Sequence, residues 1–191
     1  MTVEGRPARW SGLIISLHWI GAAIILALIA IGWAMVYGGL DSASTFDLYQ
    51  WHKSLGFVAL ALTAARLAAR FIGSAPPAPI SSHWERLLAA LAQGSLYVLT
   101  IAAIIAGWLV VSTSPLPVPT RFFDLFVIPN IAPPDALLFG RAELVHKLAA
   151  WGIAILLALH VAGALKHHFV DRDDILTRML PHWRTHRSPR G

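Results

Sequence analysis

Long stretches of this 191-residue chain contain no charged side chain. No Asp, Glu, Lys or Arg occurs in the 31 residues between Arg9 and Asp41, or in the 34 residues between Arg86 and Arg121. A helix needs about 20 apolar residues to cross the hydrocarbon core of a bilayer. Charged residues make up only 13% of the chain, about half the share usual in soluble domains. The sequence therefore predicts an integral membrane protein.

Four apolar segments are expected to cross the membrane, at about 13–37, 51–71, 87–111 and 144–169. Together they predict one all-α membrane domain, a four-helix transmembrane bundle, followed by a cytoplasmic tail at 170–191. Lys53, Arg66 and Arg70 lie near the ends of the second segment, where long side chains can reach the interface. The first segment is longer than the apolar part of a signal peptide, and no clear cleavage site follows it.

The distribution of Lys and Arg predicts the orientation. Eleven of these residues lie at the N-terminus, in the second connection and in the tail, against four on the other side, at Lys53, Arg121, Arg141 and Lys147. By the positive-inside rule both termini are cytoplasmic. The same distribution accounts for most of the basic pI, so no nucleic-acid partner is needed to explain it.

The connections between the segments differ in composition. The first external loop, at 38–50, is short, and the cytoplasmic link contains the proline-rich stretch 75–79, which is expected to be extended. The second external loop, at about 112–143, is the longest. Its aromatic residues predict a short amphipathic helix on the membrane surface around 121–128.

Four of the nine histidines fall inside the apolar segments, where ionisable residues usually mark function. His18 lies in the first segment, His52 in the second, and His146 and His160 in the fourth. The last two are 14 residues apart, which on a helix is about 40° of rotation and about 21 Å of rise. With the predicted orientation, His18 and His160 share the cytoplasmic level, and His52 and His146 share the external level.

Two facing imidazoles at each of two depths suit two haem irons. A haem with an imidazole on each face has no open coordination position and serves electron transfer. The chain has no cysteine, so covalent haem attachment, Fe–S clusters and disulfides are excluded and any haem is noncovalent and b-type. A structural zinc site would need four ligands at one depth. Polar interhelical contacts or a histidine-based proton or metal transporter remain alternatives.

Several segments resemble the bacterial cytochrome b-561 family. They are Ser-Leu-His-Trp at 16–19, His-Lys-Ser-Leu-Gly at 52–56, Glu-Leu-Val-His-Lys at 143–147, and the stretches 159–169 and 174–181. The resemblance implies a four-helix dihaem b bundle in the bacterial inner membrane, with the four histidines as the iron ligands. It also implies quinone as the membrane-side partner. Some members are superoxide oxidases that pass the electron from periplasmic superoxide to ubiquinone.

Cations near the histidines are candidates for contacts with haem propionates or with the electron donor. They are Lys53 and Lys147 on the external side and Arg66, with Arg70, on the cytoplasmic side. The alternative is that they are ordinary interfacial anchors.

Other histidines and glycines are weaker candidates. His167 and His168 could bound a cytoplasmic quinone pocket or be solvated interfacial residues, whereas His83, His182 and His186 are expected on the surface. Glycines beside the histidines would let a porphyrin approach the backbone or serve helix packing, at Gly56, Gly94, Gly107 and Gly163.

The expected function is that of a dihaem oxidoreductase that moves electrons between a periplasmic donor and ubiquinone. A patch formed by Lys53, Arg141 and Lys147 would attract an anionic donor such as superoxide. The main alternative is the membrane anchor of a larger dehydrogenase or hydrogenase, which would carry a separate redox partner protein.

Overall fold

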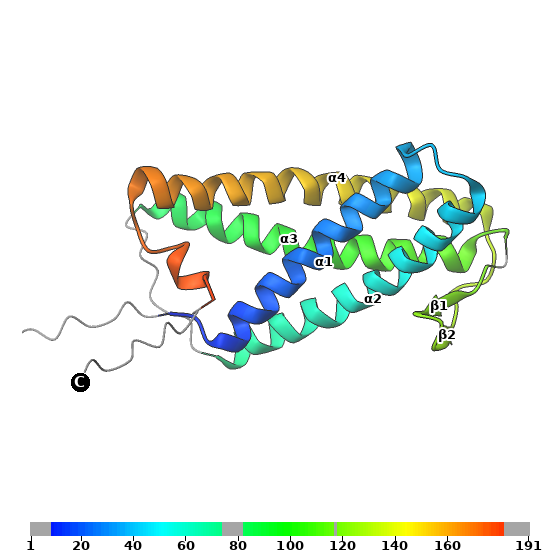
Figure 1. Cartoon of the computed structure of the whole chain (residues 1–191), viewed down its shortest axis with the longest axis horizontal. Helices are drawn as coiled ribbons and strands as arrows, with labels where there is room; N and C mark the ends of the chain where they lie inside the picture. The colour runs from blue at the N-terminus through cyan, green and yellow to red at the C-terminus, as the bar shows by residue number, and fades with distance from the viewer. Residues whose placement is uncertain (1–8, 74–81, 117, 182–191) are drawn as a thin grey trace, which may run out of the picture.

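Four long helices dominate the computed structural model, which describes residues 9–73, 82–116 and 118–181. They are α1 (Gly12–Tyr37), α2 (Ser42–Ile72), α3 (His83–Thr113) and α4 (Ala136–Lys166). All four are long and apolar enough to cross a membrane, and successive helices run in opposite directions (Figure 1). The all-α transmembrane bundle is therefore confirmed. Arg6, the link 75–79, His182 and His186 lie outside the described residues.

The helices are longer than the predicted spans. Three of them contain 31 residues, or about 46 Å, against a hydrocarbon core of about 30 Å. The predicted loop at 38–50 is mostly helical, because Asp41 caps α2 by accepting hydrogen bonds from the amides of Ala43 and Ser44, both at 3.0 Å. Hydrogen bonds from Ser44 hold the pKa of the Asp41 carboxyl below its usual value. The remaining turn contains Gly39 at a φ of +60°, which favours glycine.

The helices pack most closely as two pairs, α1 with α2 and α3 with α4. A small core of Ala103, Ala149 and Ile153 lies between α3 and α4, and Ile25 and Ile29 of α1 pack against it. Many large apolar side chains on the outside of the helices are exposed. This inverted distribution suits a lipid environment, where apolar surface needs no protein cover.

A β-hairpin replaces the surface helix predicted around 121–128. Strand β1 (Thr120–Phe122) pairs antiparallel with β2 (Phe126–Ile128). In the turn, Phe123 and Asp124 have φ values of 46° and 57°, a left-handed conformation that a continuing α-helix does not allow. The prediction of a helix here was wrong.

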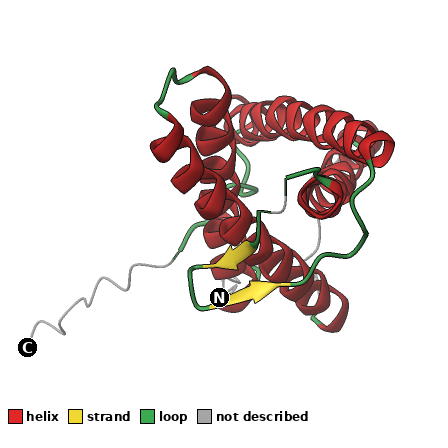
Figure 2. Cartoon of the chain, turned by 90° about the vertical axis from the view of Figure 1, so that its right-hand side faces the viewer, coloured by secondary structure: helices red, strands yellow, loops and turns green. Residues whose placement is uncertain are grey.

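Contacts with α2 hold the hairpin in place at the external end of the bundle. The Ser54 hydroxyl donates a hydrogen bond to the Arg121 carbonyl at 2.9 Å and accepts one from the Phe123 amide at 3.0 Å. The Lys53 ammonium donates to the Pro119 carbonyl at 3.1 Å. Figure 2, which looks at the end that carries the hairpin, shows the two strands lying over the helix ends.

The segment after α4 folds back against the start of α1 at the opposite end of the bundle (Figure 1). It contains a π-helical turn at His167–Asp171 and a short 3-10 helix at Thr177–Met179. The Arg9 guanidinium donates to the Thr177 carbonyl and, at 3.1 Å, to the Leu180 carbonyl. The Trp19 indole N–H donates to the Met179 carbonyl at 2.6 Å. The first part of the predicted tail is thus bound to α1.

Candidate functional site

One pair of histidines lies towards the hairpin end of the bundle. The ring centroids of His52 on α2 and His146 on α4 are 6.0 Å apart, with an angle of 76° between the ring planes. Both side chains are half-buried. We call these two residues the outer pair. It spans the two helix pairs, since α2 packs with α1 and α4 packs with α3.

The His146 imidazole is oriented by α3. Its Nδ1 lies 2.7 Å from the Ala103 carbonyl oxygen. A carbonyl oxygen can only accept, so Nδ1 carries the proton and Nε2 keeps its lone pair for a metal. Gly107 allows this approach, because a Cβ at that position would lie only 3.1 Å from Nδ1 of the ring. The role of Gly107 is thus contact with the histidine itself.

A second pair lies towards the end that holds the tail. The ring centroids of His18 on α1 and His160 on α4 are 6.3 Å apart, with an angle of 72° between the planes. We call these two residues the inner pair. The two pairs are separated along α4 by 14 residues, or about 21 Å, and the aliphatic residues Ala149 and Ile153 lie between them.

The spacing of both pairs suits a metal between two imidazoles. Two metal–nitrogen bonds of about 2 Å each, together with the ring radii, place the centroids about 6 Å apart. The Nδ1 atoms of His18 and His52 are buried and have no hydrogen-bond partner among the described residues. An added Cβ would meet no atom within 4 Å at Gly56, Gly94 or Gly163, so there is open space beside these helices. These features fit a flat, iron-bearing ligand at each level.

The candidate cations occupy different surroundings. The Arg66 guanidinium lies 5.6 Å from the centre of the Tyr97 ring, and its charge acts on both imidazoles of the inner pair. Arg70 instead donates to the Gln93 side chain at 3.0 Å. On the external side Lys53 is engaged with the hairpin, while Lys147 is exposed on α4.

Tyr97 is a residue of this site that the sequence did not reveal. Its hydroxyl is buried without a hydrogen-bond partner among the described residues. A single tyrosine in an apolar helix carries no spacing signal, because packing explains it equally well. Only its contact with Arg66 distinguishes it.

The histidines after α4 have polar and aromatic neighbours. His167 Nδ1 lies 2.7 Å from Asp173 Oδ2 and 3.1 Å from Asp171 Oδ2. The His168 ring meets Phe169 edge-on at 4.8 Å. His167 is therefore placed to exchange protons with carboxylates at the surface.

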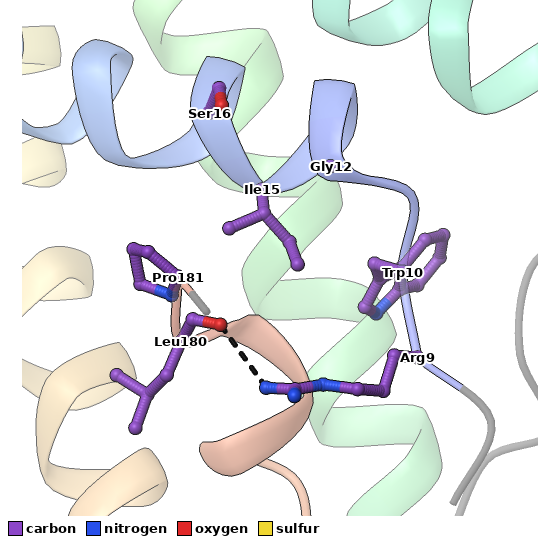
Figure 3. Close-up of a pocket in the computed structure, with 7 residues that line it drawn as sticks. All are labelled: Arg9, Trp10, Gly12, Ile15, Ser16, Leu180 and Pro181. Atoms are coloured by element: carbon purple, nitrogen blue, oxygen red, sulfur yellow. Dashed lines mark hydrogen bonds between the residues drawn. The ribbon is translucent and has the colours of Figure 1, made fainter. Parts of the chain in front are cut away.

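A cavity of about 380 Å³ lies at the same end of the molecule, between the start of α1 and the end of the described tail. Figure 3 shows Ile15 of α1 pointing towards Leu180 and Arg9 across it. Ile15 is three residues before His18. The cavity therefore lies about one helical turn from the inner pair.

Comparison with known proteins agrees with this arrangement. A family model described as prokaryotic cytochrome b561 matches residues 9–182. The chain is 31% identical over 182 residues to cytochrome b561 homolog 2 of Escherichia coli (strain K12), covering 94% of this chain and 95% of that protein. It is 26% identical over 178 residues to cytochrome b561 homolog 1 of the same organism, covering 91% and 97%.

The fold and the paired histidines define a multi-pass membrane cytochrome. The chain belongs to the prokaryotic cytochrome b561 family, as its sequence motifs indicated. Membership implies that it binds b-type haem and transfers electrons.

Proposed function

We propose that the chain is a dihaem b-type cytochrome of the bacterial inner membrane that carries single electrons between a periplasmic donor and ubiquinone. The observation that carries the proposal is the presence of two facing histidine pairs at two depths. His52 and His146 would hold the outer haem, and His18 and His160 the inner one. Haem iron supplies one-electron chemistry, alternating between its ferric and ferrous states.

The histidines have different supports for this task. His146 has Nδ1 bonded to the Ala103 carbonyl, which leaves Nε2 free and raises its basicity as a ligand. Arg66 is the cation that we assign to an inner propionate, because its charge acts on both inner imidazoles. Lys53 and Lys147 flank the outer pair as candidates for the equivalent external contacts.

The test is a dithionite-reduced minus oxidised spectrum of the purified protein, with haem quantified per chain. We expect two haems in the wild type, and one in His146→Ala and in His160→Ala, each missing a different spectral component. The surface histidine His83, whose neighbour is Trp84, provides the control His83→Ala, which should keep two. One haem in the wild type would contradict the dihaem assignment, and none would contradict the proposed function altogether.

For the donor we propose superoxide or another small anion. Each superoxide gives up one electron and becomes O₂, and two such electrons with two protons convert ubiquinone into ubiquinol. Lys53, Arg141 and Lys147 place positive charge around the external end, which would raise the encounter rate of an anion. In rapid mixing, haem reduction by superoxide should slow with rising salt and in Lys147→Gln. Absence of haem reduction above the spontaneous rate would exclude superoxide, and co-purification of a peripheral redox subunit would point to a protein donor.

For the quinone we propose the cytoplasmic end. The cavity lined by Ile15 and Leu180 is large enough for a quinone ring and is close to the inner pair. His167 and His168 lie at the same end, and the contacts of His167 with two carboxylates suit a proton relay. Filling the cavity with Gly12→Phe, or removing the relay with His167→Ala or His168→Ala, should slow quinone reduction while leaving the haem content unchanged. The matched control is Gly21→Phe, at another α1 glycine with open space beside it.

A further inference from the structure

Helix α3 contributes no histidine, yet it places a polar atom in the interior of the bundle. The Tyr97 hydroxyl is buried and has no hydrogen-bond partner among the described residues. A buried hydroxyl without a partner costs about 1–3 kcal/mol. Such a group therefore indicates an acceptor that does not belong to these residues.

The nearest charged group to Tyr97 on the page is Arg66, and it lacks a counter-charge as well. Its Nε is buried without a hydrogen-bond partner within the described chain. The ion pairs formed by the described residues do not include it. No Asp or Glu occurs between Gln50 and Trp84 on α2 and its link, or within α1.

A cation inside a membrane segment normally has a partner, because desolvating it alone is costly. Since the apolar parts of the four helices contain no carboxylate, the anion that faces Arg66 has to come from a bound molecule. Arg66 and Tyr97 lie together, with the guanidinium carbon 5.6 Å from the ring centre. One anion can therefore accept from both side chains.

The position of these two side chains identifies the anion. The charge of Arg66 acts on His18 and on His160, whereas its effect on the outer pair does not register. Arg66 also follows His52 by 14 residues, the same separation as between His146 and His160, so it shares the depth of the inner pair. Gly94, three residues before Tyr97, has open space where a side chain would begin. Haem b carries carboxylates on its propionate arms.

We infer that Tyr97 donates a hydrogen bond, beside the charge of Arg66, to a propionate carboxylate of the haem held by the inner pair. This inference rests on the proposed function. Tyr97 is then a positioning residue that also sets the inner redox potential. Both groups favour the reduced haem, because reduction removes one positive charge from the iron and a nearby cation or donor opposes positive charge.

The experiment is a spectroelectrochemical titration of the full chain, with Tyr97→Phe compared with Tyr49→Phe. The first variant removes only the hydroxyl and keeps the ring under Arg66. Tyr49 is 51% exposed and serves as the matched control. We expect Tyr97→Phe to retain two haems per chain, to lower the midpoint of one haem, and to alter the propionate bands in resonance Raman spectra. The haem that shifts should be the one absent from His160→Ala.

A second variant covers the case in which Tyr97→Phe does not assemble. Arg66→Lys keeps the charge but loses the planar donors, so it should also lower the midpoint of the inner haem while leaving the outer midpoint in place. Two haems with unchanged midpoints and unchanged propionate bands would overturn the inference and leave the proposed function standing. An equal shift in Tyr49→Phe would overturn it too. A wild type without haem would instead refute the proposed function.

Discussion

The four histidines of the bundle do not have the same surroundings, and the differences lie in single atoms. His146 is fixed through Nδ1 by the Ala103 carbonyl at 2.7 Å. The Nδ1 atoms of His18 and His52 are buried without a partner within the described chain. An imidazole whose other nitrogen is bonded to a carbonyl is a stronger and better-oriented ligand. We therefore expect His146 to be the ligand whose position depends most on its neighbours.

Gly107→Ala tests this dependence. The new Cβ would lie 3.1 Å from His146 Nδ1 and 3.2 Å from its Cε1, so the ring has to move and its bond to Ala103 weakens. Loss of such a supporting contact costs about tenfold or more in affinity for the metal. We expect weaker haem binding at the outer pair only, measured by haem titration of the apoprotein. Gly21→Ala, where the added Cβ meets nothing within 4 Å, should bind as the wild type does, and equal affinities in the two variants would contradict the argument.

At the scale of elements, the helices were predictable and the hairpin was not. A chain segment inside lipid has to satisfy its backbone hydrogen bonds internally, so long uncharged runs predict helices with little ambiguity. The ends were less predictable, because Asp41 and Asp135 extend α2 and α4 beyond the apolar runs by capping them. The segment 120–128 is short, and hydrophobic pattern alone does not separate helix from strand there.

Long-range contacts decide the structure of that segment. The Ser54 hydroxyl lies 67 residues away in sequence from the Arg121 carbonyl that it bonds, and such a contact leaves no local signal. The same holds for the site: spacing placed the four histidines at two depths, but the partnership of Arg66 with Tyr97 depends on how α2 packs against α3. Sequence periodicity gives the depth of a residue, whereas its neighbour on another helix depends on rotation and tilt.

Ser54→Ala measures what this contact contributes to the hairpin. Ser54 is 1% exposed, and its removal leaves the Phe123 amide and the Arg121 carbonyl without their partner. Loss of a buried partner costs about 1–3 kcal/mol, here in the local stability of the hairpin. Hydrogen exchange of the amides at 120–128 should therefore become faster while the centres of the helices stay protected. Ser42→Ala, at an exposed position of the same helix, is the control, and unchanged exchange in Ser54→Ala would show that Lys53 and the strand pairing suffice.

At the scale of the whole molecule, the two ends of the bundle have different partners. The hairpin end carries the outer pair and the cations Arg141 and Lys147. The other end carries the inner pair, the cavity and the docked tail. Electron transfer across the membrane has a direction only if these ends face opposite compartments. The orientation rests on the excess of Lys and Arg in the segments at the tail end, so it is a claim about the entire chain.

The absence of cysteine makes that orientation directly measurable, because any cysteine introduced is unique. Leu125→Cys lies at the hairpin turn, where Leu125 is 76% exposed, and Arg172→Cys lies in an exposed position between α4 and the 3-10 helix. With a membrane-impermeant maleimide applied to spheroplasts, we expect immediate labelling at position 125 and labelling at position 172 only after permeabilisation. Labelling in the reverse order would place the outer pair at the cytoplasmic face. A periplasmic donor would then have to meet the haem of the inner pair, and the proposed path of the electron would run in the opposite sense through the chain.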